Sequence, residues 1–463
     1  MYGQLYRNVL LPLFDGMVKR RCTMSHWRNS EQSQWWSREQ LEEVQLQSLR
    51  SLVEHALQTC PYYAEEWGAL GLNATRLRSL QDFTAWPLLT RDLVRRQRQR
   101  MRTTSTLKRI SKATGGSSGE PLAFDLDSGS NDRRTAMMYR GYGWAGGAPG
   151  TKQLHIWGTA VGNIPQWKRF KMNLHRAFDR HLVLSCFDFT PDRMRQNLDR
   201  MNRYRAEVIV AYTNSLYEFA LFLKRESLVP VSPRSIIVGA EKLHDFQRTL
   251  IEEVFRAPVF ETYGSREFML IGAECDQHTG LHLSMENLLV EVLDEDGSQT
   301  PSGQEGNVVV TDLFNYGMPF VRYATGDRAI AGFETCSCGR GLPLLKKVVG
   351  RNAEILTAPD GRRVSGLFVP HLMKEFPEVR RFQVVQQELD LIDVKLVVAG
   401  SLLEAHRELM LSELRRVMGA EVNFNLQLVD DIPLTNAGKM KVVVNAIGSR
   451  QADRNRELVL GAR

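Results

Sequence analysis

Apolar side chains at helical spacing fill the first hundred residues of the chain. Leucines and valines between residues 37 and 102 recur at steps of three and four, which is the spacing of one helix face. The pair Cys60-Pro61 breaks the pattern, and a second turn signal follows at residues 86–91. The pattern therefore predicts a helical start over residues 1–105.

After residue 150 the chain alternates short apolar runs with helical segments. The runs are Gln153–Trp157, Leu182–Phe187, Val208–Ala211, Ser235–Val238 and Val259–Thr262. The helical segments between them include Pro191–Tyr204, Ser215–Glu226 and Leu243–Phe255. Apolar runs of this length separated by helices are typical of parallel strands buried in an α/β layer.

The pattern of predicted elements changes twice more toward the C-terminus. Beyond Gly280, strand-like segments around a turn at residues 294–297 predict a β-rich portion. Two strands, a helix over Leu402–Met418 and a further strand then predict a small α+β domain. We therefore expect an α/β fold with a large N-terminal domain, 1–349, and a small C-terminal domain, 350–463.

Composition fits a globular protein with a basic surface. The chain has 463 residues, 43% of them hydrophobic, which is enough for a sizeable core. The net charge is +7, and eight cations lie between Arg91 and Arg109 with almost no acidic company. Such a run is typical either of nucleic-acid binding or of a solvated helix face beside an anionic ligand. No interleaved aromatic residues or nucleic-acid motif accompany it, so we expect no nucleic-acid partner.

The N-terminal segment and the cysteines bear on location. Six unevenly spread cysteines do not form a disulfide framework, and neither a cleavable signal nor an apolar stretch of bilayer length is evident. We therefore expect a cytoplasmic protein. Residues 1–21 carry an apolar stripe followed by Lys19-Arg20-Arg21. This pattern fits weak contact with a membrane surface, but a helix docked on its own domain is the commoner outcome, and Pro12 would kink it.

A glycine-rich loop at residues 112–121 is the strongest local candidate for chemistry. Glycines let backbone N–H groups turn inward, and small hydroxyl side chains add donors for phosphate oxygens. The alternative to phosphate binding is that this segment is an exposed turn or a linker. The residues that we expect to bind nucleotide phosphates are Thr114, Gly115, Gly116, Ser117, Ser118 and Gly119.

Four later segments follow this loop in a fixed order. They are Glu261–Glu267 (ETYGSRE), Val321–Asp327 (VRYATGD), Val349–Arg351 (VGR) and Pro433–Lys439 (PLTNAGK). With the loop, they make the chain resemble the adenylate-forming superfamily over residues 51–444. The run CSCGR at 336–340 makes it most similar to the phenylacetate–CoA ligase-like and capsular-polysaccharide-associated branch.

The resemblance implies a ligase that uses ATP, Mg²⁺ and CoA. Such enzymes convert a carboxylic acid and ATP to an acyl-adenylate, which the CoA thiol then attacks. A near alternative transfers the acyl group to a carrier-protein thiol, an amine or a hydroxyl, and a third is a non-catalytic relative that binds a surface. The acid pocket is expected between His155 and Gly239, with Trp157, Phe187, Tyr212 and Asn214 as candidates.

The resemblance also assigns roles to single residues. Glu241, Tyr263 and Gly264 would line the adenine pocket, and Asp327 would accept hydrogen bonds from the ribose hydroxyls. Glu267 would bind Mg²⁺, which needs few protein ligands.

Two further roles, and two departures from the pattern, concern the mobile part of such enzymes. Arg351 would contact the ribose or phosphate, and Lys439 would reach the acyl carboxylate and α-phosphate from a C-terminal domain that rotates. The chain carries Glu120 where many relatives have a lysine after the loop, and Glu354 where relatives have a hinge aspartate. Charge neutralisation at the loop must therefore come from elsewhere.

A cysteine-rich pair of segments flanks the β-rich portion. Cys275, Cys336 and Cys338 with one imidazole make a usual structural Zn²⁺ set. His278 and His282 both lie nearby, and the resemblance favours His282. The Cys-x-Cys spacing is tighter than usual, so an unmetallated cluster of buried thiols is the alternative.

Overall fold

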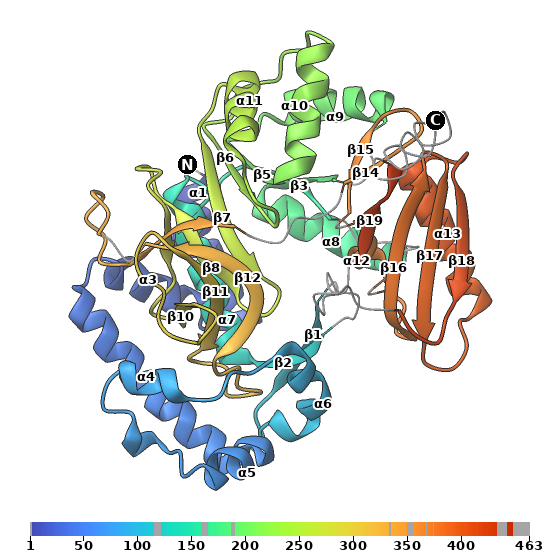
Figure 1. Cartoon of the computed structure of the whole chain (residues 1–463). Helices are drawn as coiled ribbons and strands as arrows, with labels where there is room; N and C mark the ends of the chain where they lie inside the picture. The colour runs from blue at the N-terminus through green and yellow to red at the C-terminus, as the bar shows by residue number, and fades with distance from the viewer. Residues whose placement is uncertain are drawn as a thin grey trace, which may run out of the picture.

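The computed structural model describes most of the chain. The described residues are 2–114, 122–158, 165–186, 190–332, 335–349, 355–366, 368–373, 375–432 and 442–447. Figure 1 shows the main body, in blue to yellow and light orange, beside a smaller C-terminal unit in dark orange and red.

One 11-stranded sheet organises the main body, in the order β10-β11-β12-β13-β9-β8-β7-β6-β5-β3-β4. Its strands are β3 (Gln153–Trp157), β4 (His181–Ser185), β5 (Val208–Tyr212), β6 (Ser235–Gly239), β7 (Val259–Ser265), β8 (Met269–Glu274), β9 (Leu281–Leu283), β10 (Leu288–Leu293), β11 (Glu305–Asp312), β12 (Tyr323–Ala331) and β13 (Leu344–Val348). Strands β3 to β7 pair in parallel, and the pairing is antiparallel from β7 through β8 to β10. Strand β7 therefore joins a parallel half to an antiparallel half.

Helices cover the parallel half because its strands are apolar on both faces. Helices α9 (Pro191–Tyr204), α10 (Thr213–Arg225) and α11 (Asp245–Phe255) pack on the face that carries Ile209, Ile236 and Val238. The opposite face, with Val210 and Ile237, packs against the end of α7 (Ser128–Trp144). This burial on both sides explains why the parallel strands are uniformly apolar in sequence.

The helical start packs on the antiparallel half from residue 38 onward, whereas its first segments pack on the helices of residues 128–144 and 166–179. Its helices are α1 (Tyr2–Leu5), η1 (Tyr6–Leu10), α2 (Leu11–Leu13), η2 (Phe14–Val18), α3 (Thr23–Ser33), α4 (Arg38–Thr59), α5 (Pro61–Ala69), η3 (Ala74–Arg76), η4 (Gln81–Ala85) and α6 (Arg91–Met101). Ser37 and Gln40 form a reciprocal capping box that begins α4. Leu49, Leu52 and Val53 of α4 then enter the core that this half of the sheet shares.

Around Pro12 the first helix adapts rather than breaks. Pro12 lies in α2, and the segments on either side, η1 and η2, are wound as π-helix. Such wider turns are a known way to absorb a missing backbone donor. Tyr6 and Leu11 are buried against the body of the protein, so one face of this segment is docked on its own domain.

A separate hairpin carries the glycine-rich loop. Strands β1 (Arg109–Ala113) and β2 (Ala123–Asp127) pair antiparallel in a two-stranded sheet. Residues 115–121 connect them and lie outside the described residues.

The C-terminal unit is built on a four-stranded sheet in the order β18-β17-β16-β19. Its elements are β14 (Ile355–Thr357), β15 (Arg363–Ser365), α12 (Phe368–Met373), β16 (Val379–Glu388), β17 (Leu391–Val398), α13 (Glu404–Met418), β18 (Asn423–Leu428) and β19 (Val443–Asn445). The side-chain amide of Gln386, fully buried, donates to the carbonyl of Thr357 and accepts from its N–H, which ties β14 to β16.

These observations confirm the predicted α/β fold with a β-rich portion and a small α+β unit. The apolar runs from residue 153 onward are the parallel strands, and the three named helical segments are α9 to α11. The boundary at residue 350 stays a prediction, because 350–354 lie outside the described residues. Among the described residues, no helix is both long and apolar enough to cross a bilayer.

Candidate nucleotide and acid site

The base of the glycine-rich loop is a closed hydrogen-bonded stem. Thr114, buried, follows β1, and its backbone N–H donates to the carbonyl of Leu122, the residue just before β2. Its Oγ1 accepts the N–H of Leu122 at 2.9 Å and a guanidinium N–H of Arg91, also at 2.9 Å. Thr114 thus fixes where the loop leaves and re-enters the fold.

Arg91 links this stem to Glu267. Its Nη1 lies 3.8 Å from Oε1 of Glu267, which is buried in the turn between β7 and β8. The helix start is held in place because the backbone of Leu89 bonds to β12 on both sides of Tyr323, and Thr90 caps α6. The sequence had suggested only a basic run here, and it did not single out Arg91.

Further cations surround the loop base. Arg266 donates from Nε to the carbonyl of Ala113, at the end of β1. Arg134, fully buried in α7, donates to the carbonyl of Arg266. Burial and the neighbouring guanidinium groups lower the pKa of Lys112 to about 8. Positive charge therefore gathers at the base of the loop, although the loop carries Glu120 where many relatives have a lysine.

Tyr263 and Asp327 meet although 64 residues separate them. The hydroxyl of Tyr263, on β7, donates to Oδ2 of Asp327, on β12, at 3.0 Å. Thr325 Oγ1 accepts the backbone N–H of Asp327 and donates to the carbonyl of Val308. This arrangement fixes the Asp327 carboxylate within β12, where the sequence had suggested a turn.

Gly264 is needed next to this pair for steric reasons. The register shifts between Tyr263 and Gly264, and a Cβ on Gly264 would lie 1.9 Å from the carbonyl oxygen of Met269. No side chain fits there, so a glycine lets the β7–β8 hairpin close and brings Glu267 toward the loop.

Glu241 lies at the carboxyl end of the parallel strands, where α/β proteins bind ligands. It follows β6, and its Oε2 accepts the N–H of Asn214 at the start of α10. Its carbonyl accepts the hydroxyl of Thr213. The carboxylate thus stabilises a helix N-terminus, a contact that sequence reasoning did not foresee.

Two of the expected acid-pocket residues are in contact at the same edge. The rings of Trp157 and Tyr212, at the ends of β3 and β5, are 4.3 Å apart and nearly perpendicular. Asn214 lies two residues after Tyr212, at the start of α10, and accepts a hydrogen bond from Gln247. Phe187 lies outside the described residues. Because Trp157 and Tyr212 end neighbouring strands, their rings lie together at the carboxyl edge of the parallel strands, where Glu241 also lies.

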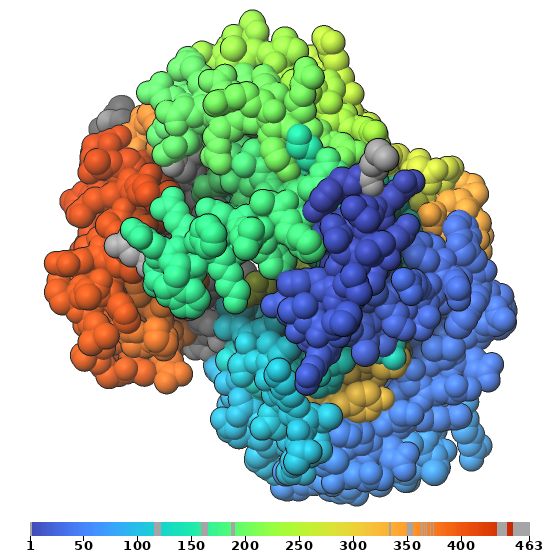
Figure 2. Space-filling model, turned by 180° about the vertical axis from the view of Figure 1, so that it is seen from behind, coloured from blue at the N-terminus to red at the C-terminus, as the bar shows by residue number. Residues whose placement is uncertain are grey.

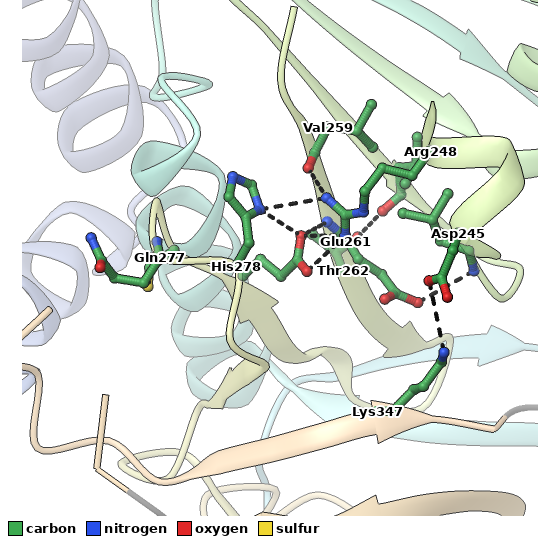
Figure 3. A network of polar contacts seen from close by, with 12 residues as sticks. Asp245, Arg248, Val259, Glu261, Thr262, Gln277, His278 and Lys347 are labelled. Carbon is green, nitrogen blue, oxygen red and sulfur yellow. Dashed lines mark hydrogen bonds and ion pairs between the residues drawn. The ribbon is translucent and has the colours of Figure 1, made fainter. Parts of the chain in front are cut away.

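A partly buried polar network supports the strand that carries Tyr263 (Figure 3). Arg248 of α11 donates to both carboxylate oxygens of Glu274 and also bonds to the carbonyl of Val259. Glu274 accepts the backbone N–H of Glu261, and burial together with the Glu274 carboxylate raises the pKa of Glu261 to about 7. His278 joins this network through Glu274 at 3.2 Å.

Four side chains converge beneath the β-rich portion. Cys275, His282, Cys336 and Cys338 place their ligand atoms within 4.8 Å of one another. The sulfurs of Cys275 and Cys336 are 3.7 Å apart, and Cys338 Sγ is 3.3 Å from Nε2 of His282. His278 is engaged with Glu274 instead, which is the alternative that the sequence had left open.

These distances fit a tetrahedral zinc ion. Bonds of about 2.3 Å from sulfur to zinc imply a sulfur–sulfur distance of about 3.8 Å. His282 contacts the carbonyl of Leu342 through Nδ1 at 3.1 Å, so Nε2 faces the thiols. Burial lowers the pKa of His282 to about 4, which keeps the imidazole neutral and able to bind metal.

Some predicted residues cannot be located. Gly115, Gly116, Ser117, Ser118 and Gly119 lie outside the described residues, as do Arg351 and Lys439. Their assignments remain predictions from the sequence. The structure brings together the others in two groups, the loop base with Glu267 and the Tyr263–Asp327 pair, and the two groups are joined through residues 263–267.

Comparison with known proteins identifies relatives over most of the chain. Protein CapK of Staphylococcus aureus is 22% identical over 419 residues, covering 88% of this chain and 89% of that protein. A phenylacetate–coenzyme A ligase of Thermus thermophilus is also 22% identical, over 440 residues, covering 88% of this chain and 97% of that enzyme. The chain is thus similar, over most of its length, to CapK and to a phenylacetate–coenzyme A ligase. The resemblance inferred from the motifs is therefore confirmed.

Family and structure comparisons agree with this relationship. A model of the CapK C-terminal domain matches residues 356–446 of this chain. Its fold matches a crystal structure of 2-hydroxyisobutyryl-CoA ligase in the postadenylation state in complex with R3-HIB-AMP, with a TM-score of 0.58, 17% identity and coverage of 90% of this chain and 91% of that one. An open conformation of the same ligase, in complex with 2-HIB-AMP and CoA, gives a TM-score of 0.56 with 18% identity, covering 87% of this chain and 91% of that one. This chain thus has the fold of that ligase.

Proposed function

We propose that the protein is an AMP-forming acid–thiol ligase. The carboxylate of a small acid attacks the α-phosphorus of ATP, pyrophosphate leaves, and the thiol of CoA then attacks the acyl carbonyl and releases AMP. The observation that carries the proposal is that Tyr263 contacts Asp327, while Glu267, four residues along the same hairpin, pairs with Arg91, which in turn donates to Thr114 at the loop stem. Relatives named phenylacetate–coenzyme A ligase support it.

Asp327 is the residue that we assign to the ribose. Tyr263 donates to one of its oxygens, and a carboxylate has further lone pairs for ribose hydroxyls. Tyr263 and Gly264 would then border the base, with Glu241 at the neighbouring strand end. The Tyr263 hydroxyl holds the Asp327 carboxylate in position before nucleotide arrives, so little ordering is needed on binding.

Arg91 is the residue that we assign to the phosphates in place of the absent loop lysine. It already reaches both the loop base and Glu267, so its charge lies between the two groups expected to meet the polyphosphate. A planar guanidinium with several donors suits phosphate oxygens. Glu267 would hold Mg²⁺, which when bound supplies positive charge between phosphate oxygens. Lys112 and Arg266 add to the local positive field.

Three further assignments rest on the sequence resemblance. Lys439 would bridge the acyl carboxylate and the α-phosphate during adenylation, and Arg351 would contact the ribose or phosphate. The C-terminal domain, 350–463, would rotate between the two half-reactions.

Free cysteines throughout the described chain also support a reducing, cytoplasmic location.

We propose that Cys275, His282, Cys336 and Cys338 bind a structural zinc ion. Four protein ligands would leave no open position for a substrate. Near the cluster, Arg340 donates to Gln34 and packs over Trp35 and Trp144. The metal would therefore stabilise the contact between the helical start and the sheet, not the chemistry.

An ATP–pyrophosphate exchange screen over aryl, fatty and amino acids tests the proposal. Exchange should depend on one class of acid, and product analysis should find AMP and not ADP. Addition of CoA should yield a thioester with the activated acid. Exchange without thioester would favour a carrier-protein thiol, amine or hydroxyl as acceptor. Absence of exchange with every acid, or release of ADP, would contradict adenylate chemistry.

A further inference from the structure

Two helical segments far apart in sequence expose apolar rows on one face of the protein. The first row is Leu5, Val9, Leu13 and Met17, with exposed fractions of 43% to 74%. They repeat every four residues over a length of about 18 Å. The other side of the same segment, with Tyr6 and Leu11, is docked on the protein. The outer row is therefore held in a fixed place although it is exposed.

The second row lies on α8 (Gln166–Asp179). Trp167, Phe170 and Leu174 occupy one side of this helix and are exposed by 64%, 71% and 61%. No residue of α8 is buried. Exposed aromatic and aliphatic side chains at helical spacing on such a helix are costly in water, which indicates a surface that becomes covered. We call the two rows together the apolar-basic face.

Contacts between the two segments join the rows into one surface. The ring of Phe14 lies 5.5 Å from Phe178 and 5.9 Å from His175. Tyr6 packs on Phe178 and donates to Asp179. Figure 2 shows the N-terminal segment, dark blue, beside the α8 region, blue-green, on the same side of the molecule. The rows are therefore presented together.

The charge of this face is strongly positive. Residues 1–21 and 166–180 contain nine lysines and arginines and two acids. One acid, Asp15, is buried, and the other, Asp179, accepts from Tyr6 and is paired with His175. The acids are therefore used inside the structure, while the cations, such as Lys168 and Lys171, point outward.

A basic cavity opens beside α8. It has a volume of about 460 Å³ and lies where α8 ends and β4 begins. Among its lining residues are Lys152, Arg176, Arg180 and Arg200. Of these, only Arg180 forms an ion pair with an acid of the described chain, Glu207 at 3.7 Å. The cavity can thus accept a phosphate group.

We propose that the apolar-basic face binds an anionic phospholipid surface, with the basic cavity receiving a phosphate headgroup. Apolar rows flanked by cations are the features that place a helix in the membrane interface. The cavity adds a feature that a stripe alone lacks, a group of cations for a phosphate, of which Lys152, Arg176 and Arg200 have no acidic partner among the described residues. A soluble acidic protein would also match the positive charge of this face. Trp167 and the aliphatic rows favour a lipid surface instead, because tryptophan is enriched at membrane–water interfaces.

Vesicle co-sedimentation of the full chain tests this proposal. Vesicles of phosphatidylglycerol and phosphatidylcholine in equal parts should bind the protein at least tenfold more tightly than phosphatidylcholine alone, and binding should weaken as salt rises. The triple variant Trp167→Ser, Phe170→Ser, Leu174→Ser should lose at least tenfold. The pair Arg176→Gln and Arg200→Gln should lose about 25-fold, since each basic residue near such a surface contributes about fivefold.

Matched variants on other surfaces serve as controls. Val229→Ser, Leu403→Ser and Leu428→Ser remove equally exposed apolar side chains, and Arg407→Gln with Arg415→Gln removes two exposed cations of α13. These should bind vesicles like the wild type, and all variants should keep the wild-type thermal unfolding midpoint. Equal binding to both vesicle types, or equal losses in the control variants, would overturn the proposal. So would binding of inorganic phosphate, or of an acidic carrier protein, without any binding to vesicles.

Discussion

Removal of the Arg91 guanidinium should impair adenylation far more than it impairs folding. Arg91 is 22% exposed in its side chain, and its contact with Glu267 spans 3.8 Å. A partly exposed pair of this kind contributes at most about 1 kcal/mol to stability. Thr114 Oγ1 would still accept the N–H of Leu122 in an Arg91→Gln variant, so the stem of the loop should remain closed.

The effect on catalysis should be larger because phosphate charge would meet one cation fewer. A hydrogen bond to a charged group contributes about 1.5–3 kcal/mol. That range corresponds to a loss of about 10- to 150-fold in kcat/KM for ATP. Arg91→Lys keeps the charge but not the two-pronged geometry, so we expect a smaller loss.

The assay is acid-dependent ATP–pyrophosphate exchange at varied ATP, with thermal unfolding in parallel. Arg95→Gln is the matched control, because Arg95 lies one turn further along α6 and pairs with Asp92 at 3.4 Å. If Arg91→Gln and Arg95→Gln lose the same amount of activity, Arg91 acts only through the general positive field. If Arg91→Gln unfolds at a much lower temperature, its role is structural. Either result would refute the assignment.

Four further changes test other parts of the site. Asp327→Ala should weaken ATP binding about tenfold or more, as measured by calorimetry, because it removes charge-assisted hydrogen bonds to the ribose. Cys338→Ser should lose bound zinc, measured as metal per chain, and should unfold at a lower temperature than the wild type. Lys439→Ala should lose about a hundredfold in pyrophosphate exchange, on the scale of one electrostatic contact to the transition state, yet should still convert supplied acyl-adenylate and CoA to thioester. Glu261→Gln should remove a pH dependence of stability, measured by urea titration at several pH values. The folded-state pKa of Glu261, about 7, lies above the ordinary value of a glutamate. The stabilisation of the wild type is therefore complete below about pH 4.5, and up to about 3 kcal/mol of it is lost as the pH rises through 7.

Opposite outcomes are equally clear for these four. Unchanged ATP affinity would remove Asp327 from the ribose. A metal-free wild type that is as stable as the metal-loaded protein would remove the zinc site. Equal losses in both half-reactions would make Lys439 a residue of the fold or of CoA binding. Parallel stability curves for the wild type and Glu261→Gln would mean that Glu261 is not the titrating group.

Local patterns predicted the parallel half of the fold well. Strands such as β3 and β5 are buried on both faces, so their apolar runs stand out in sequence with nearly correct limits. The same holds for α9, whose Thr190 cap and Pro191 mark its start. The first and last residues of these elements could be predicted without tertiary information, because the apolar runs and capping residues lie within or next to each segment.

Contacts between distant segments could not be predicted in this way. That Tyr263 donates to Asp327 depends on the register of β7, β8 and β12 across the sheet, and no local pattern encodes it. The position of Arg91 depends on the bridge between Leu89 and Tyr323. The choice of His282 over His278 depends on a backbone turn that aims His278 at Glu274. Which residues meet in the site is therefore determined by these pairings between distant segments and cannot be derived from composition.

The order of strands in the large sheet has a consequence for synthesis of the chain. Strand β9 lies between β8 and β13, yet β13 is made more than 60 residues later, after the excursion through β10, β11 and β12. Until then, a nascent chain leaves one edge of β9 open, and open edges invite pairing with other chains. Cys336 and Cys338 leave the ribosome just before β13, so closure of the thiol cluster and insertion of the last strand are one late event. Premature termination or proteolysis between residues 294 and 343 should therefore yield a fragment that aggregates, whereas a cut after β13 leaves a complete sheet.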